Sequence, residues 1–161
     1  MPRKQRLSSR VIDDKDKEII MLLQKDGRMS LTEIAKKVRL SIDSVHNRIK
    51  AMIKKGVFLT GIFVEPRVIG FPLIADVKIK LKNISEEIRE KLIKYLTEHH
   101  NVTNLLGVMG DYDLTCVIIA KDSEELEKVS MEIRHRFKDL IDEWKSILVL
   151  KTYKFEQYDL I

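Results

Sequence analysis

The sequence predicts an α+β protein that consists of a three-helix unit followed by a unit in which strands and helices alternate. Apolar residues recur at helical spacing three times between residues 13 and 55, and segments typical of strands lie among two further helical segments in residues 73–154. Glycine and proline concentrate between these two regions, which places a linker there. The 161 residues, 44% hydrophobic and 34% charged, suit a folded protein of two small domains.

The first two helices have clear start and stop signals. A helix is predicted over residues 13–25, because aspartates gather in its first turn, where the helix dipole favours negative charge, and Asp26-Gly27 follows its end. Its apolar stripe comprises Ile19, Ile20, Leu22 and Leu23. A second helix begins at the capping box Ser30-Leu31-Thr32-Glu33, in which the serine hydroxyl and the glutamate satisfy unpaired amides, and runs to about Val38.

A third helix is predicted over residues 42–55, capped by Ser41 and ended by Gly56. The side expected to be buried carries Ile42, Val45, Ile49, Met52 and Ile53. The opposite side carries polar and charged residues, mostly donors and cations: Asp43, Ser44, His46, Asn47, Arg48, Lys50 and Lys54. The three helices form a helix-turn-helix, in which the first two bury the inner side of the third and leave its outer side free.

The C-terminal unit is predicted to be ferredoxin-like, a βαββαβ order. Alternating apolar and polar residues indicate its first strand, and the Gly110-Asp111 turn between two branched apolar segments indicates a hairpin. The expected elements are, in order, a strand at 75–81, a helix at 85–99, strands at 102–109 and 112–120, a helix at 122–137 and a strand at 146–154.

These elements divide the chain into five regions. Gly61, Pro66, Gly70 and Pro72 mark the boundary between the two domains. The predicted regions are a basic N-terminal arm (1–12), a helix-turn-helix domain (13–60), a strand-containing linker (61–72), a ferredoxin-like domain (73–154) and a C-terminal tail (155–161).

Positive charge is concentrated in the N-terminal part. Residues 1–60 contain 15 lysines and arginines against seven acidic residues, whereas residues 61–161 contain 15 against 18. Only the first part therefore suits a polyanion such as double-stranded DNA. The first ten residues carry four of these cations and no acid. Such an arm can follow DNA phosphates or a minor groove, or be no more than a solvated chain end.

Composition also argues against several classes of protein. Cys116 is the single cysteine, so neither a disulfide framework nor a cysteine-based zinc site is available. No apolar stretch approaches the roughly 18–20 residues that span a bilayer, and no apolar segment follows the basic start. We therefore expect a cytoplasmic protein without a membrane partner.

The candidate DNA-binding residues all belong to the third helix or its cap: Ser41, Asp43, Ser44, His46, Asn47, Arg48, Lys50 and Lys54. Asn47 and Lys50 are the candidates for base edges, because an amide matches adenine and an ammonium matches the acceptors of guanine. Phosphate suits Ser44, Arg48 and Lys54 better. The alternative is that these residues form only a solvated helix face.

A longer pattern resembles the N-terminal module of the Lrp/AsnC family of transcription regulators. It comprises Ile12-Asp13, Asp16, Ile19, Leu23, Asp26-Gly27-Arg28, Ile34-Ala35, Val38-Arg39-Leu40-Ser41, Val45, Arg48, Met52, Gly56-Val57, Gly61, Pro66 and Gly70. Gly110-Asp111-Tyr112-Asp113 is similar to the characteristic turn of the family's second, ferredoxin-like module. The resemblance covers residues 13–154 and implies a sequence-specific DNA-binding regulator.

Two features depart from the family pattern. Arg39 stands where the family usually has glycine in the helix-turn-helix turn, and a left-handed Arg39 would cost roughly 1 kcal/mol. The basic arm is longer than the family's usual start, so the resemblance assigns it no role.

The resemblance implies homodimers formed through the C-terminal modules, with their sheets facing each other and the linker strands contributing, and often higher homo-oligomers. Two-fold symmetry then predicts a pseudo-palindromic operator. Lys78 and Lys80 lie on a sheet face and must reach a rim or a partner acid, because a charge does not remain in a dry interface.

The resemblance further implies an amino-acid effector near the hairpin turn. The candidate effector-binding residues are Gly107, Met109, Gly110 and Asp113. Glycine permits a close backbone approach, and a carboxylate can hold an ammonium group. The alternative is purely structural, with the glycines making the turn and Asp113 fixing it.

We predict no enzyme activity, catalytic residue, cofactor or metal site. His99-His100 is a conspicuous pair, but adjacent histidines on a helix point apart and no metal-ligand spacing joins them. Neither a glycine-rich phosphate loop nor a nucleophile motif is present. Two alternatives stay open: a sirohaem-decarboxylase-like enzyme on the same architecture, and an assembly or metabolite-sensing protein that has lost DNA binding. Repression by blocking polymerase and activation by recruiting it would use the same DNA contacts.

Overall fold

The computed structural model describes residues 11–82 and 85–160, and the chain forms two compact units. The first unit comprises the chain up to Phe63 together with the C-terminal residues from Lys154 onward. The second unit comprises Val64–Tyr153. The predicted arm lies almost entirely outside the described residues and stays a prediction. The return of the C-terminal tail to the first unit was not predicted.

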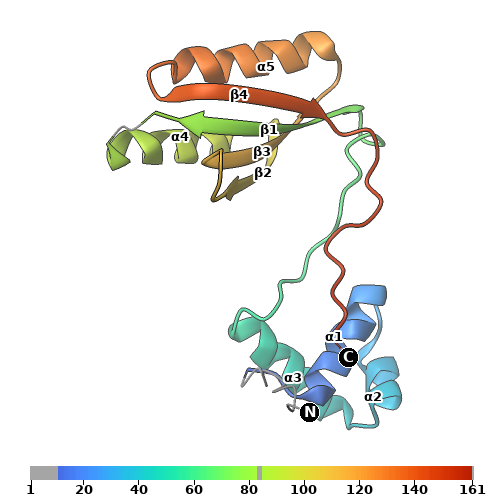
Figure 1. Cartoon of the computed structure of the whole chain (residues 1–161). Coiled ribbons are helices and arrows are strands. Elements are labelled where there is room, and N and C mark those ends of the chain that lie inside the picture. Colours follow the sequence, from blue (N-terminus) through green and yellow to red (C-terminus); the bar gives the residue numbers. More distant parts are fainter. Residues whose placement is uncertain (1–10, 83–84, 161) are drawn as a thin grey trace, which may run out of the picture. The chain divides into compact units, whose positions relative to one another are not determined.

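The first unit contains three helices, α1 (Asp14–Lys25), α2 (Leu31–Val38) and α3 (Ile42–Lys54), as expected of a helix-turn-helix (Figure 1). The capping box predicted for α2 is present: the Ser30 hydroxyl accepts from the Glu33 amide, and the Glu33 carboxylate accepts from the Ser30 amide. Ser41 caps α3 as predicted. Local polar residues therefore set where each helix begins.

A small apolar core holds the three helices together. Its buried members are Ile19, Ile20, Ile34, Ala35, Val38, Val45 and Met52. Burial of each large aliphatic side chain stabilises the unit by about 1.5–3 kcal/mol. The prediction for Ile42 and Ile53 was wrong, since 47% and 38% of these residues are exposed. They lie at the flank of the stripe formed by Val45 and Met52, outside the narrow part of α3 that is buried.

The turn between α2 and α3 keeps the left-handed conformation at Arg39, with φ 57° and ψ 51°. The Arg39 amide donates to the carbonyl of Ala35, and the next amide, of Leu40, donates to the same carbonyl at 3.1 Å. The turn geometry is therefore retained although the residue is not glycine, and the Cβ atom of Arg39 carries the steric cost.

The second unit is ferredoxin-like, as predicted. Its elements are β1 (Leu73–Leu81), α4 (Glu86–Glu98), β2 (Val102–Gly107), β3 (Leu114–Ala120), α5 (Ser123–Arg136) and β4 (Ile141–Leu148). The four strands form one antiparallel sheet in the order β2-β3-β1-β4. The sheet and its two helices are labelled in Figure 1.

Two details of this unit differ from the prediction. The last strand was expected at 146–154 but is β4, at Ile141–Leu148. The amides of Leu140 and Ile141 donate to the Phe137 carbonyl at 2.9 and 2.8 Å, so the chain turns directly from α5 into the strand. Exposed charged residues early in β4 concealed its strand pattern. The linker, residues 61–72, contains no strand in this single chain.

Both helices of the second unit pack on one face of the sheet. The buried cluster joins residues of β1, α4, β3 and α5: Ala75, Val77, Ile79, Leu92, Leu96, Leu114, Cys116, Ile118, Val129 and Ile133. Burial raises the pKa of the Cys116 thiol to about 12, so this cysteine stays a neutral packing residue at physiological pH.

The opposite face of the sheet, on which neither α4 nor α5 packs, carries charged residues. The Lys78 ammonium lies 2.9 Å from the Asp76 carboxylate and donates to the Thr115 hydroxyl at 3.0 Å. The Thr115 hydroxyl donates to the other Asp76 oxygen at 2.7 Å. The expectation that Lys78 reaches a partner acid is therefore confirmed, and Lys80 is exposed.

Among the helices of the described ranges, none has the length and apolar character needed to span a membrane.

The strain at Arg39 gives a prediction about stability. Replacing Arg39 by glycine removes the clash of Cβ in the left-handed conformation, so the free energy of unfolding should rise by up to about 1 kcal/mol in urea titrations. Arg39→Ala removes the same guanidinium but keeps Cβ, and it should bring no gain. Equal stability of the glycine and alanine variants would contradict this account.

Candidate nucleic-acid interface

The outer side of α3 is a continuous exposed stripe. Its members recur at helical spacing: Asp43, His46, Asn47, Lys50 and Lys54. Val45 and Met52 point the other way and are 0% and 2% exposed. None of the five stripe side chains makes a hydrogen bond or ion pair within residues 11–82 and 85–160, so each is available to an external partner.

The two serines predicted as DNA contacts have different surroundings. The Ser41 hydroxyl accepts from the Ser44 amide at 3.2 Å, so it is engaged in capping α3. Ser44 is half-buried. Of the eight sequence-predicted residues, these two and Arg48 lie outside the exposed stripe.

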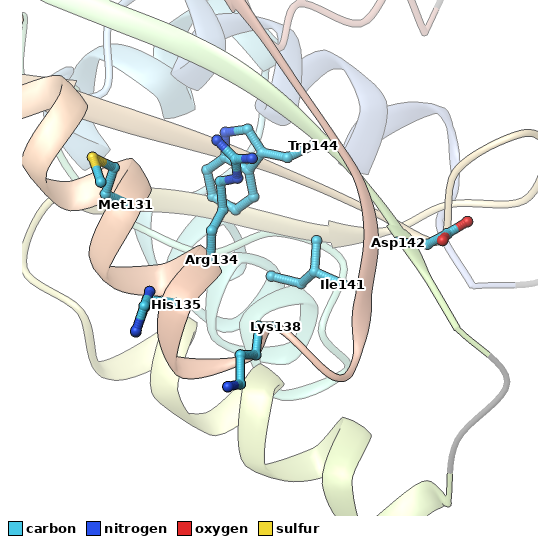
Figure 2. Close-up of a pocket in the computed structure, with 7 residues that line it drawn as sticks. All are labelled: Met131, Arg134, His135, Lys138, Ile141, Asp142 and Trp144. Atoms are coloured by element: carbon cyan, nitrogen blue, oxygen red, sulfur yellow. The ribbon is translucent and has the colours of Figure 1, made fainter.

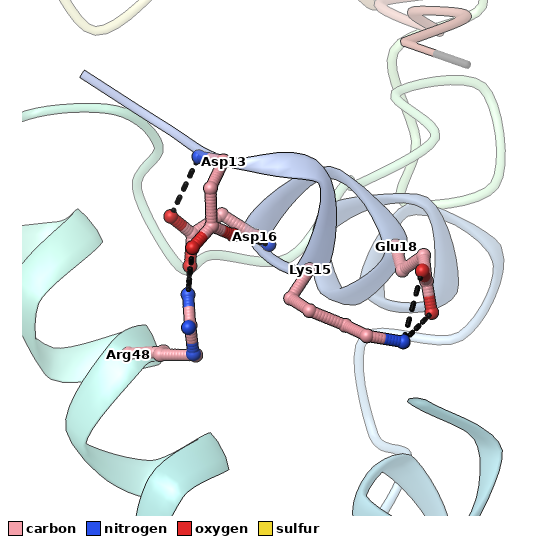
Figure 3. A network of polar contacts seen from close by, with 5 residues as sticks. All are labelled: Asp13, Lys15, Asp16, Glu18 and Arg48. Atoms are coloured by element: carbon pink, nitrogen blue, oxygen red, sulfur yellow. Dashed lines mark hydrogen bonds and ion pairs between the residues drawn. The ribbon is translucent and has the colours of Figure 1, made fainter. Parts of the chain in front are cut away.

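Arg48 connects α3 to the start of α1 (Figure 3). Its Nη1 atom lies 2.7 Å from Asp13 and 2.8 Å from Asp16. These two aspartates also form the capping box of α1, with amide-to-carboxylate distances of 3.0 and 2.9 Å. The same guanidinium nitrogen therefore contacts both acids of the cap, and Arg48 fixes the orientation of α3 against α1.

The charges of this contact stabilise one another. The hydrogen bond from Arg48 lowers the pKa of the Asp13 carboxyl below its usual value of 3.8. The two aspartates raise the pKa of Arg48 in return, with the Asp13 hydrogen bond as the largest cause.

Lys15 makes a further contact between helices. Its ammonium donates to the Val38 carbonyl at 2.8 Å and so caps the end of α2.

Cations next to the stripe extend its positive potential. Lys36, Lys37 and Arg39 lie at the end of α2 and in the turn, and all three are exposed. None of them forms an ion pair in the part of the chain that the structure describes, and the same is true of Lys50 and Lys54. Such a group of unpaired cations attracts a polyanion and releases its counterions.

The predicted effector turn is fixed by its own backbone and by Asp113. The Asp113 carboxylate accepts from the Leu81 amide at 2.7 Å, and the Asp113 amide donates to the Ile79 carbonyl at 3.0 Å. Gly110 has φ 149°, a conformation that favours glycine, and Met109 is fully exposed. The structural role of Asp113 is therefore observed, while effector binding at this turn stays a prediction.

A hollow of about 420 Å³ lies between α4 and β2, and Gly107 belongs to its lining. Arg89 also lines it, and the Arg89 Nε atom is buried without a hydrogen-bond partner in the described structure. Sequence reasoning missed Arg89, because nothing in the local pattern distinguishes it from other exposed helix cations.

A second hollow, of about 340 Å³, lies between α5 and β4 (Figure 2). It is lined by Met131, Arg134, His135, Lys138, Ile141, Asp142 and Trp144. The clustering of cations at the end of α5 was visible in the sequence, but its position opposite Trp144 depends on where β4 begins, which was predicted wrongly.

The statement that His99 and His100 point apart was wrong. Their rings are stacked, with centroids 4.9 Å apart, because α4 ends at Glu98 and both residues follow the helix. Burial and the neighbouring His100 lower the pKa of His99. In residues 11–82 and 85–160 no group of three or more His, Cys, Asp or Glu residues could hold a metal ion.

Comparison with known proteins gives matches to both units. The model of the AsnC-type helix-turn-helix domain matches residues 12–53, and the model of the Lrp/AsnC ligand binding domain matches residues 74–158. The HTH-type transcriptional regulator FL11 of Pyrococcus furiosus is 33% identical over 153 residues, covering 89% of this chain and 93% of that protein. The HTH-type transcriptional regulator Ptr1 of Methanocaldococcus jannaschii is 31% identical over 146 residues, covering 89% and 95%.

Solved structures share the fold. An AsnC family transcriptional regulator from Agrobacterium tumefaciens superposes with a TM-score of 0.82 at 21% identity, covering 92% of this chain and 97% of that one. A transcriptional regulator from Neisseria meningitidis in complex with L-Met gives a TM-score of 0.79 at 19% identity, covering 89% and 93%.

The contact of Arg48 with Asp13 gives a prediction about pH. A carboxyl whose pKa is lowered in the folded state adds stability above its usual pKa, and this stability is lost as the pH falls through the folded-state value. Arg48→Gln should therefore lower the free energy of unfolding at pH 7 by about 1 kcal/mol or less. The difference from the wild type should shrink in acid, as the pH falls from the usual value of 3.8 through the lowered pKa of the folded-state Asp13 carboxyl.

Lys50→Gln is the matched control, because Lys50 is exposed on the same helix and has no acidic partner in the described residues. It should leave stability unchanged at pH 7 and in acid. A deficit of Arg48→Gln that is as large in acid as at pH 7 would show that the lost stability does not come from the ion pair.

Proposed function

The chain belongs to the Lrp/AsnC family of DNA-binding transcription regulators, and from this premise we propose that it binds pseudo-palindromic operators as a homodimer or higher homo-oligomer. The observation that supports this proposal most strongly is the exposed stripe of α3, whose polar side chains have no partner in the described chain. In the proposed complex the α3 helices of two copies enter successive major grooves of one face of the duplex.

The roles of the stripe residues follow from their chemistry and exposure. Asn47 and Lys50 are proposed to read base edges, and Lys54 is proposed to contact phosphate. Asp43 and His46 flank them on the exposed side. Arg48 is proposed to position α3 through α1, which changes the phosphate role expected from the sequence. Ser41 and Ser44 set the start of the helix, close to the phosphate backbone.

We propose that a second copy of the chain buries apolar residues on the two segments that connect the units, residues 59–72 and 149–153, here called the connecting segments. Large apolar residues on these segments are exposed by 82–89%: Leu59, Ile62, Phe63, Val68, Leu150 and Tyr153. A monomeric protein rarely leaves so many large apolar residues in water. The uncovered sheet face supports the same partner, because the charges of Asp76 and Lys78 already satisfy each other and need no group from the second copy.

An amino acid is the proposed effector, and the hollow that contains Gly107 is its proposed site. The Arg89 guanidinium is suited to a carboxylate, and Gly107 lets an effector approach the backbone closely. The Neisseria meningitidis regulator of the same fold was solved in complex with L-Met. Met109, Gly110 and Asp113 stay candidates for the wall of this site next to the turn.

The proposal places the protein in the cytoplasm and assigns it no catalytic activity. The enzymatic alternative, a sirohaem-decarboxylase-like protein, has its own signature: purified protein that carries a tetrapyrrole absorption band would favour it. Colourless protein whose binding to duplex DNA weakens with salt would favour the regulator.

The proposed base contacts predict a loss of DNA affinity on substitution. The combined change Asn47→Ala and Lys50→Ala removes two base contacts from each subunit, worth about 1–3 kcal/mol each, so affinity for a duplex selected with the wild-type chain should fall at least about 100-fold. Fluorescence anisotropy at fixed salt measures it. Lys128→Ala removes an exposed lysine of α5 and should cost little. A double variant that still separates selected from random duplex would overturn the assigned contacts.

The proposed dimer predicts that charge on the connecting segment separates the copies. Ile62→Asp places a carboxylate where a second copy should bury an apolar side chain, so sedimentation should show a shift toward the monomer. Thr60→Asp adds the same charge at an exposed polar position nearby and should leave the mass unchanged. A full-sized oligomer of the Ile62→Asp variant would argue against this interface.

A further inference from the structure

The C-terminal residues 154–160, here called the C-terminal strap, belong to the DNA-binding unit. Gln24, at the end of α1, makes two hydrogen bonds to the backbone of Tyr158. Its Nε2 atom donates to the Tyr158 carbonyl at 3.1 Å, and its Oε1 atom accepts from the Tyr158 amide at 2.9 Å. Leu160 packs against the apolar core of the three helices. Figure 1 shows the C-terminal segment, drawn in red, running to α1.

Further contacts join the segment that follows α3 to the segment that follows β4. In the first unit, the rings of Phe63 and Phe155 meet edge to face, with centroids 5.1 Å apart. In the second unit, Arg67 donates to the carbonyls of Val149 and Leu150 at 2.7 and 3.3 Å. The DNA-binding unit is therefore attached by two segments that contact each other, and the second one follows directly after β4.

A surface segment without helix or strand is usually mobile unless other residues hold it in place. The strap instead pairs both polar backbone groups of one residue with the same side-chain amide and places a leucine against a core. A unit on one flexible linker samples many orientations, whereas a second attachment removes most of them. This restriction of orientation should raise DNA affinity most where two half-sites must be bound at once.

We propose that the C-terminal strap is a positioning element, which ties α1 to the end of β4 and thereby sets the separation at which two α3 helices meet DNA. Gln24 and Leu160 are the positioning residues, and neither is proposed to touch DNA. The positioning role rests on the proposed function, because it is measured by DNA binding. The docking of the strap on α1 can be measured without DNA.

Docking is tested without DNA by hydrogen exchange of the full chain. Gln24→Ala removes both bonds to Tyr158, and Leu160→Ala removes most of the apolar contact. Amides of α1 should exchange up to about tenfold faster in each variant, the loss expected for one or two partly exposed hydrogen bonds. Lys25→Ala, at the adjacent exposed position, should leave exchange unchanged. Exchange in α1 that is the same in Gln24→Ala, Leu160→Ala and wild type would overturn the docked strap.

Positioning is tested with three duplexes: one selected with the wild-type chain from a random pool, one of its half-sites, and the full site with five added base pairs between the halves. Five base pairs turn one half-site to about the opposite face of the duplex. The Gln24→Ala chain should bind the half-site like wild type, bind the full site about tenfold more weakly, and lose less affinity than wild type on the insertion.

Two results on these duplexes would count against the proposals in different ways. An equal loss on half-site and full site in Gln24→Ala would show that the strap only stabilises the fold, which overturns its positioning role. Failure of the wild-type chain to prefer any selected duplex would count against the proposed function instead, while the exchange experiment would still decide whether the strap is docked.

Discussion

The proposed function depends on α3 being buried on one side only. Only Val45 and Met52 of this helix are fully enclosed, and they suffice because α1 and α2 supply the rest of a small core. Arg48 adds an ionic attachment to both acids of the α1 cap, so the helix is fixed in orientation without using its outer side. The outer stripe is then left with polar groups that the chain itself does not satisfy, which is the condition for binding another molecule.

The second unit meets the opposite requirement, and the proposed partner of its open sheet face is a second copy of the chain rather than DNA. Its open sheet face holds a charged pair, Asp76 and Lys78, that is neutralised within the chain and bonded to Thr115. Burial of Asp76 and Lys78 against a second copy would therefore leave neither of these two charges unpaired. The exposed apolar residues of the connecting segments would add apolar surface to such a contact between copies.

Local signals predicted most of the fold, and contacts between distant residues explain the errors. Caps at Ser30 and Ser41 and the periodicity of apolar residues located the helices. Arg48, Arg89 and Gln24 were not predictable in their observed roles. Arg48 and Gln24 bond to residues 32 and 134 positions away, and Arg89 lines a hollow that it shares with β2. The start of β4 was missed because an exposed edge strand carries charges that hide its alternation.

The central claim is that the outer side of α3 meets duplex DNA. The most direct test is amide NMR of the isotope-labelled full chain titrated with a selected duplex. The account predicts the largest shift changes at exposed positions of α3, such as His46, Asn47 and Lys50, with small changes along β1 and β3. Shift changes confined to the sheet unit, with α3 unperturbed at saturating duplex, would contradict it.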